Sequence, residues 1–403
     1  MNLELGAEYE AFRGVVRAFL AEHWSAASPV TPTAAAAPAA AAAPDAARAF
    51  RRKAIEAGLL YRHIPRDYGG GGGGYDSIKA MLVEQEFAAA GAPGEITGIG
   101  PRMLAPTLVA RGADWQKQRF IGPTLLGDYI WCQGYSEPGA GSDLAALSTR
   151  AVLEDGHWVL NGQKIWTSHA HYADYMFVLA RTEPEAPLHQ GISYLLLDMK
   201  SPGITVRPLR QMHGASGFNE VFFDNVRTPA DWIVGERGAG WLVARTTLGF
   251  ERASINSPDM MEGLFHKLLA LARTTVRDGQ PLLAQDRFQQ AFASLEAQVL
   301  SHRYSVARQR SMDAAGQDPG LATLCNKLYG TDIGLRIAEL AQEVVGDGGL
   351  LMPGPGVTSE QMDWPFWIMR SLGVTIAGGA SNIQRNIIAE RGLGLPRDAR
   401  GAK

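Results

Sequence analysis

One segment of this 403-residue chain has the side chains and backbone of a loop that could face a flat, polar ligand. Residues 135–143 read YSEPGAGSD, in which proline fixes one backbone angle and two glycines permit close approach. Ser136, Ser142 and several backbone N–H groups are then free to donate hydrogen bonds. On its own the segment would also fit an ordinary surface loop.

A second segment adds a flat apolar surface. Residues 161–168 read NGQKIWTS, with the indole of Trp166 between a predicted Asn-Gly turn and the hydroxyls of Thr167 and Ser168. A ring-sized stacking surface beside hydroxyl and amide donors is what a flavin ring requires from its protein. Alone, this segment would also fit a hairpin with a buried tryptophan. Both segments in this order favour flavin binding.

Four further stretches agree with these two: IPRDYGG (64–70), GFNEVFFDNVRTP (217–229), VGERGAGW (234–241) and IQRNIIAERGLGLPR (383–397). With them, the sequence resembles the acyl-CoA dehydrogenase family over nearly its whole length. The resemblance implies FAD as cofactor, an acyl-CoA thioester as substrate and an electron-transfer flavoprotein as electron acceptor. It implies a reaction that removes the α-proton to a carboxylate base and a hydride from the β-carbon to the flavin, giving a trans-2-enoyl-CoA.

The resemblance also implies where the base is found. Many members carry it as Glu in a Tyr-Glu-Gly-Thr-Ser turn, but this chain reads TIAGGASNIQR over 375–385, with Gly378 at that position. A second branch, which includes enzymes similar to the isovaleryl and long-chain types, has a Glu-Arg pair on the helix after the β-domain. Here LGFERAS supplies Glu251 as the base and Arg252 in a supporting role. Their small and apolar flanks argue against the solvated surface on which Glu-Arg pairs are common.

By the same resemblance, the backbone N–H of Gly378 donates to the thioester oxygen, which carries enolate charge in the transition state. The positions that match flavin-ring contacts are Gln133, Tyr135, Ser136, Gly141, Ser142, Trp166 and Ser168. Those that match the pyrophosphate and adenine end, from a neighbouring subunit, are Arg287, Gln342 and Gly346. Ala380 and Asn382 depart from the Thr and the Glu or Gln usual in that turn, so some polar contact with the dinucleotide is weakened.

Composition narrows the class of protein. The formal net charge of −3 gives no reason to expect nucleic acid or an anionic membrane as partner. Two cysteines, the lack of a roughly 20-residue apolar run and the lack of a secretion signal suit a soluble cytoplasmic enzyme. His169 and His171 have no further ligands at metal-binding spacing, so we expect no metal site.

The pattern along the chain predicts the elements that hold these residues. Apolar spacing predicts helices over 3–24, 47–58, 75–90 and 101–112, then over 241–273, 286–314 and 322–345, with short β-rich runs between 130 and 233. The Ala/Pro-rich residues 26–47 read as a flexible segment without a catalytic role. The six glycines 69–74 lack the lysine of a P-loop and read as a solvent-exposed turn.

These elements predict an α+β fold like that of the acyl-CoA dehydrogenases. It comprises an N-terminal helical domain (1–129), a middle antiparallel β-barrel-like domain (130–236) and a C-terminal four-helix bundle (237–403). The resemblance implies a homotetramer, or a hetero-oligomer with a paralogue. It also implies that residues 95–108 line the acyl pocket, and the nearby glycines suggest room for a branched, ring-bearing or long chain. Two alternatives stay open: a flavin monooxygenase or N-hydroxylase on the same fold, and a non-catalytic partner subunit of a hetero-oligomer.

Overall fold

A computed structural model describes residues 6–24, 45–254, 257–350 and 359–396. The chain divides into two compact units, Met1–Gln211 with Ala215–Phe250, and Met212–Gly214 with Glu251–Lys403. Of the predicted flexible segment, residues 26–44 lie outside the described part of the chain. Its last three residues, 45–47, are helical, which corrects the prediction there.

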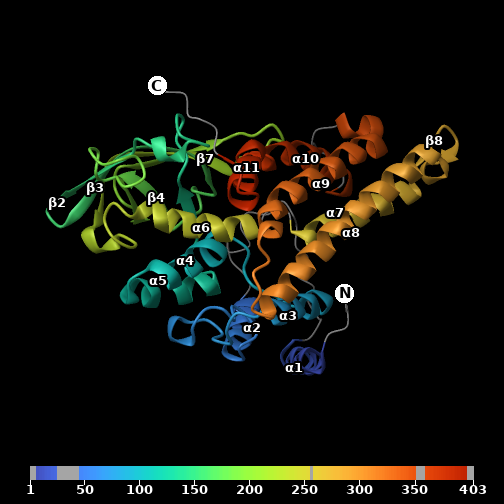
Figure 1. The fold of residues 1–403 in the computed structure, drawn as a ribbon, viewed down its shortest axis with the longest axis horizontal. Helices are drawn as coiled ribbons and strands as arrows, with labels where there is room; N and C mark the ends of the chain where they lie inside the picture. The colour runs from blue at the N-terminus through green and yellow to red at the C-terminus, as the bar shows by residue number, and fades with distance from the viewer. Residues whose placement is uncertain (1–5, 25–44, 255–256, 351–358, 397–403) are drawn as a thin grey trace. The chain divides into compact units, whose positions relative to one another are not determined.

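Helices form the first part of unit one (Figure 1). They are α1 Ala7–His23, α2 Asp45–Glu56, α3 Ser77–Ala89, α4 Ala105–Arg111 and α5 Asp114–Leu126, with a π-helical turn at Gly100–Leu104 before α4. Asp76 caps α3 by accepting hydrogen bonds from the N–H groups of Ile78 and Lys79. Buried side chains such as Leu20, Phe87 and Phe120 join these helices into one core. The sequence pattern predicted all of them except α5.

The glycine run 69–74 is a turn, but the prediction that it is solvent-exposed is wrong for its centre. Gly70 and Gly71 are buried, while the other four glycines are exposed. A β-carbon on Gly70 would lie 2.3 Å from the carbonyl oxygen of Ile64, and one on Gly71 would lie 2.4 Å from that of Leu60. The run is therefore glycine because two stretches of backbone pack directly against each other there.

Gly71→Ala is expected to destabilise the protein by about 1–3 kcal/mol, because the added methyl group must displace backbone rather than a flexible side chain. Chemical denaturation followed by tryptophan fluorescence measures the change. The matched control is Gly14→Ala, at an exposed position in α1 with no atom within 4 Å of the new β-carbon. That control is expected to stabilise slightly, as alanine usually does in a helix. Equal effects of the two variants would contradict the packing argument.

A seven-stranded sheet completes the architecture of unit one. Its strands are β1 Trp131–Gly134, β2 Arg150–Glu154, β3 His157–Ser168, β4 Tyr175–Arg181, β5 Ile192–Asp198, β6 Ile204–Leu209 and β7 Phe218–Pro229. The order is β1-β4-β2-β3-β7-β6, with β5 also paired to β4. The pairings of β4 with β1 and β2 are parallel and the others in this sheet are antiparallel. The sheet is thus mostly antiparallel, as predicted.

The predicted Asn161-Gly162 turn is wrong. Both residues lie inside β3, where the pairing with β7 shifts register between Leu160 and Gly162. The turn that joins β2 to β3 is Asp155-Gly156, and both of these residues have positive φ. Either dipeptide suits a tight turn, so the choice rests on the pairing of β3 with β2 and β7.

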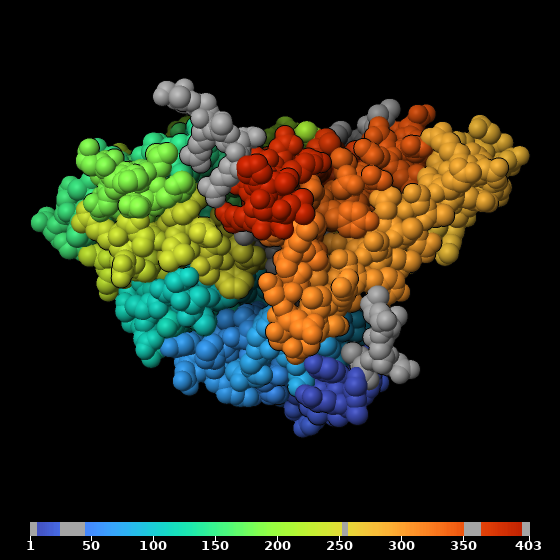
Figure 2. Space-filling model, viewed as in Figure 1, coloured from blue at the N-terminus to red at the C-terminus, as the bar shows by residue number. Residues whose placement is uncertain are grey.

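Unit two is built on four long helices: α7 Pro258–Thr274, α8 Asp286–Ala314, α9 Leu321–Val345 and α10 Ser359–Val374. They pack around a core that includes Phe265, Phe288 and Ile337. The short strands β8 Val276–Arg277 and β9 Gln280–Pro281 form a hairpin between α7 and α8, and Figure 2 shows it at the surface. The shorter α11, Ser381–Ile387, follows α10.

The predicted helix 241–273 is instead two helices. The first is α6 Gly240–Ser254, which starts in unit one and whose last turn, from Glu251, belongs to unit two. The second is α7, which begins where Ser257 caps Met260 and Pro258 occupies the first helical position. A Ser-Pro pair is a helix start signal. Proline would break a hydrogen bond inside a helix, but at the first helical position its missing N–H would have no intrahelical partner anyway.

Candidate active site

The loop 135–143 is held against strand β3 in unit one. The N–H of Ile165 donates to the carbonyl oxygen of Ser136 at 2.9 Å, and Nζ of Lys164 donates to that of Tyr135 at 3.0 Å. Within the loop, Glu137 and Ala140 exchange two backbone hydrogen bonds of 3.0 Å each. The two segments that the sequence singled out are therefore neighbours in the fold.

A buried ion pair underlies this contact. Nζ of Lys164 lies 2.7 Å from Oε1 of Glu137, and the two side chains are 0% and 5% exposed. Glu137 also accepts hydrogen bonds from the backbone N–H of Ser148 and Thr149 and from the hydroxyl of Ser148. The carboxylate is thus fully engaged by donors, which is what a buried charge needs. Sequence reasoning did not single out either member of the pair.

Trp166 points out of the protein from a strained backbone. Its side chain is 58% exposed, so the alternative of a buried tryptophan is wrong. Its φ is +59°, a conformation that is uncommon for large residues, and it lies where the β3–β7 register shifts between Lys164 and Thr167. The ring of Phe218 packs edge-on against the indole, with 6.0 Å between centroids. An exposed indole held in this way is typical of a functional surface.

Five of the other residues predicted to contact a flavin ring are at least partly exposed. Gln133, Ser136 and Ser168 are half-buried, and Gly141 and Ser142 are exposed. Within the described residues, no group accepts a hydrogen bond from the N–H of Gly141 or Ser142. An exposed indole beside unused N–H and hydroxyl donors suits a flat ring with polar edges.

Two predicted donors turn inward instead. The ring of Tyr135 is buried and packs against Phe177 and Tyr194, so its side chain belongs to the core of unit one. Thr167 is fully buried, and no described group pairs with its hydroxyl oxygen. Of the two hydroxyls after Trp166, Ser168 is therefore the one at the surface.

In unit two, the turn 375–380 carries Gly378 in a left-handed conformation. The φ values of Gly378 and Gly379 are +62° and +99°. Among the residues that the structure describes, none accepts a hydrogen bond from the N–H of Gly378 or Gly379. These unused donors are compatible with the predicted contact to a thioester oxygen.

Lys327 of α9 bonds to this turn and is influenced by the charge of Glu251. Its side chain is 2% exposed, and its Nζ donates to the carbonyl oxygens of Thr375 at 3.2 Å and Gly379 at 2.8 Å. Burial lowers the pKa of Lys327, and the negative charge of Glu251 opposes that shift. The half-buried Glu251 and the Gly378 turn therefore share one electrostatic neighbourhood. Arg252 follows in the same helix, and its side chain lies outside the described part of the structure.

The residues predicted at the dinucleotide end also lie together in unit two. Arg287, at the start of α8, forms an ion pair with Glu343, the neighbour of the exposed Gln342 in α9. Gly346 ends α9 with φ +58°. Arg287 would have to exchange its carboxylate partner to bind a pyrophosphate. Arg277, which the sequence analysis missed, donates to the carbonyl of Glu343 and is a second basic group at this helix end.

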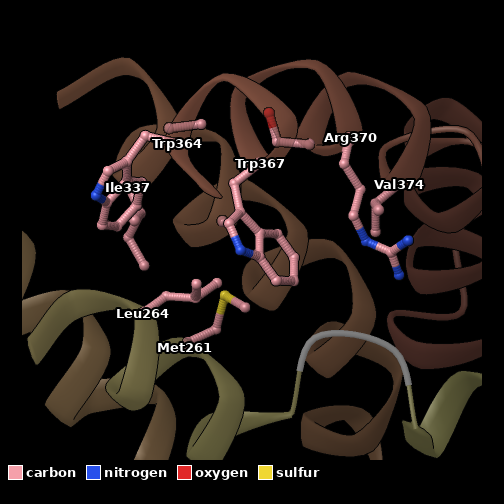
Figure 3. Close-up of a pocket in the computed structure, with 10 residues that line it drawn as sticks. Met261, Leu264, Ile337, Trp364, Trp367, Arg370 and Val374 are labelled. Atoms are coloured by element: carbon pink, nitrogen blue, oxygen red, sulfur yellow. The ribbon is translucent and has the colours of Figure 1, made fainter. Parts of the chain in front are cut away.

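A small cavity inside unit two is not the acyl-CoA site. It lies between α7, α9 and α10, and Figure 3 shows the side chains that line it, among them Met261, Leu264, Ile337, Trp364, Trp367 and Arg370. Its volume is about 20 Å³, which is room for about one water molecule. An acyl chain therefore cannot enter it.

No helix within the described ranges is both long and apolar enough to cross a membrane. In the same part of the chain, no three His, Cys, Asp or Glu side chains gather where they could hold a metal ion.

Three family models match the chain in order: the N-terminal, middle and C-terminal domains of acyl-CoA dehydrogenase, over residues 6–128, 132–226 and 238–393. The acyl-CoA dehydrogenase IpdE1 of Mycobacterium tuberculosis is 38% identical over 396 residues, 98% of this chain and 100% of that protein. A solved structure described as the Tcur3481-Tcur3483 steroid ACAD has a TM-score of 0.77 and 27% identity, covering 99% of this chain and 100% of that one. The ChsE4-ChsE5 complex from Mycobacterium tuberculosis has a TM-score of 0.77 and 29% identity, covering 98% and 100%.

Proposed function

This chain belongs to the acyl-CoA dehydrogenase family, and we propose that it dehydrogenates an acyl-CoA between the α- and β-carbons with Glu251 as the base. The fold prediction is confirmed at the level of the family: an N-terminal helical domain, a central β half-barrel and a C-terminal helical domain. The enzyme is an acyl-CoA dehydrogenase, an oxidoreductase. The domain boundaries at 130 and 237 stay predictions.

The observation that carries the assignment of the base is that Lys327 bonds to the turn of Gly378 and interacts electrostatically with the half-buried Glu251. A weakly acidic α-proton needs a carboxylate near the α-carbon and donors near the thioester oxygen. Lys327 interacts electrostatically with Glu251 and bonds to the carbonyl of Gly379, next to Gly378. Glu251 would take the α-proton, and the N–H of Gly378 would stabilise the enolate-like oxygen.

FAD is the proposed cofactor. The exposed Trp166 and the unused N–H groups of the 135–143 loop support it, since they offer stacking and hydrogen bonds to a flat ring. Gln133, Ser136, Gly141, Ser142 and Ser168 would hold the ring. When bound, FAD would accept the two electrons and the β-hydrogen that leave the substrate. An electron-transfer flavoprotein as the next acceptor and a cytoplasmic location stay predictions.

A ring-bearing acyl group and a second, different subunit complete the proposal. One similar structure is described as a steroid ACAD, and both similar structures carry two chain names in their descriptions. Gly378 stands where many members carry the side chain of Glu, which is compatible with a bulky acyl group. We therefore propose a hetero-oligomer, with the homotetramer as the competing outcome.

The test uses the purified chain, alone and co-expressed with a candidate partner dehydrogenase chain. Native mass measurement gives the assembly, and absorbance at the flavin bands gives FAD content. Anaerobic bleaching is then measured with a panel of linear, branched and steroid-ring acyl-CoAs. Bleaching by ring-bearing members supports the proposal, whereas an FAD-loaded assembly that no acyl-CoA bleaches would overturn it. Rapid reaction of the reduced enzyme with oxygen would favour the monooxygenase alternative.

A relocated base tests the geometry further. Gly378→Glu by itself is expected to lower the rate of bleaching, because two nearby carboxylates raise one pKa and the new side chain intrudes on the substrate. Its φ of +62° adds about 1–2 kcal/mol of backbone strain for any residue other than glycine. Combined with Glu251→Gln, the same substitution is expected to recover part of the lost rate. A double variant slower than both single variants would argue against shared access to the α-carbon.

A further inference from the structure

The turn of Gly378 is held by a buried ammonium group, whose burial costs desolvation free energy. Lys327 is 2% exposed, and an amine with three donors is normally left in water. Here two of its N–H groups bond to main-chain oxygens, of Thr375 at 3.2 Å and Gly379 at 2.8 Å. A neutral donor would satisfy these carbonyls without the desolvation cost of a charge. The desolvation cost of this charge therefore indicates that the charge itself has a role that a neutral donor would not fill.

A second buried side chain holds the same turn. Gln384 is 2% exposed, and its Nε2 donates to the carbonyl oxygen of Gly378 at 3.1 Å. A β-carbon on Gly379 would lie 2.3 Å from that nitrogen, so this contact requires glycine at 379. Lys327 and Gln384 thus bond to the carbonyl oxygens of Thr375, Gly378 and Gly379. We refer to these two residues as the carbonyl clamp.

The clamp fixes the direction of two N–H groups in the turn, those of Gly379 and Ala380, and it holds Gly378 by its carbonyl oxygen. In a trans peptide the N–H points away from its own carbonyl, so a clamped Gly378 oxygen turns the N–H of Gly379 to the opposite side. A clamped Gly379 oxygen does the same for the N–H of Ala380. No described group accepts from the N–H of Gly378, Gly379 or Ala380. The clamp thus holds carbonyls on one side and leaves unused donors in the turn.

We propose that Lys327 and Gln384 are positioning residues that hold the 375–380 turn so that its N–H groups stabilise the thioester oxygen during α-proton removal by Glu251. This inference rests on the proposed function and extends it to two buried residues that hold the turn. The positive charge of Lys327, which interacts with Glu251 and bonds beside Gly378, would also stabilise a developing enolate. A donor that is misplaced by about 1 Å can cost about 10² in rate.

The experiment separates proton removal from flavin reduction. The probe is the 3-thia analogue of the best substrate in the acyl-CoA panel, since sulfur at the β-position leaves no hydride to transfer. Exchange of its α-hydrogens with deuterium in D2O, followed by mass spectrometry, reports proton removal alone. The FAD-loaded assembly is tested with Lys327→Met and Gln384→Met, and Lys267→Met, at an exposed position of the same unit, is the control.

For Lys327→Met we expect exchange and bleaching to slow by about 10², as when an oxyanion donor is lost, with an unchanged dissociation constant for the probe. For Gln384→Met we expect about a tenfold loss, and the double variant should lose less than the product, since both act on one turn. A fall in FAD content, probe affinity and melting temperature together, without a selective loss of rate, would mean a structural role and overturn the proposal.

The controls separate failure of this inference from failure of the proposed function. If wild type exchanges and Glu251→Gln does not, the base is confirmed independently of the clamp. Wild-type exchange in Lys327→Met or in Gln384→Met would then refute the clamp alone. Gln384→Met decides the question if Lys327→Met does not fold. Absence of exchange and bleaching in wild type with every acyl-CoA would instead refute the proposed function.

Discussion

Glu251→Gln is expected to slow anaerobic flavin bleaching by a good acyl-CoA substrate by about 10²–10⁴, the usual cost of losing a general base. That range corresponds to roughly 3–5 kcal/mol of activation free energy. Glutamine keeps the size and polarity of the side chain but cannot take a proton. The loss should therefore appear in the rate of reduction, while FAD content and acyl-CoA affinity stay near wild type.

The matched control is Glu339→Gln, on an exposed position of α9 in the same unit. This substitution also removes one negative charge from unit two, at a position far in sequence from the 375–380 turn. Bleaching at the wild-type rate is expected for it. Near-normal bleaching in Glu251→Gln would mean that the base lies elsewhere and that Glu251 is structural. Loss of FAD from Glu251→Gln would also count against a purely chemical role.

The sequence predicted those elements whose signals are local. Helix α8 begins at Asp286 and ends at Ala314 as predicted, because Phe288, Phe292, Leu295 and Val299 follow helical spacing and no glycine or proline interrupts the rest. The break between α6 and α7 was missed although its signal was present: Ser257 and Pro258 are a capping residue and an N1 proline. The cap of Ser257 and the fixed φ of Pro258 start a new helix although helical periodicity continues across them.

Features that depend on distant pairing could not be predicted in this way. The positive φ and exposure of Trp166 arise where β3 loses register with β7, whose sequence lies about 50 residues further on. The competing turns at Asp155-Gly156 and Asn161-Gly162 are equivalent as dipeptides, and the sheet chooses between them. Local residue propensity does not predict the position of the turn or the conformation of Trp166, because the cross-strand partners determine both.

The residues of the candidate site also divide into those found from local motifs and those whose partners are distant in sequence. Glu251 and Gly378 came from motifs, whereas Lys327 has no motif of its own in the stretch LCNKLYG. Its partners are carbonyl oxygens 48 and 52 residues away, and every residue type has a carbonyl. Lys164 was overlooked for a related reason, since its partner Glu137 lies 27 residues earlier in the other motif. The one local signal for Lys327 is that it is the only charged residue in the stretch LCNKLYG, which indicates burial.

Lys164→Met is expected to lower the free energy of unfolding by about 3–5 kcal/mol, the usual cost of removing one partner from a buried ion pair. The substitution leaves the Glu137 carboxylate 5% exposed without its counter-charge, and the carbonyl of Tyr135 without its donor. Because this pair underlies the 135–143 loop, FAD should also dissociate more readily. Chemical denaturation and FAD retention on gel filtration measure the two effects.

Two control variants test whether the loss comes from charge. Glu137→Gln combined with Lys164→Met should regain most of the stability, since it removes the stranded charge. Lys200→Met, whose side chain is 79% exposed in its ion pair with Asp174, should change stability by less than about 1 kcal/mol.

The stabilising effect of Lys164 should also depend on pH. Burial alone would raise the pKa of Glu137, but Lys164 and the donors from Thr149 and Ser148 hold it down to about 2. A carboxylate with a lowered pKa stabilises the fold above its unfolded pKa, about 4.3, and loses that contribution as the pH falls towards 2. The stability difference between wild type and Lys164→Met should therefore narrow through this window, as Glu137 becomes neutral in both. A difference that is independent of pH would show that Lys164 stabilises the loop by packing rather than by charge.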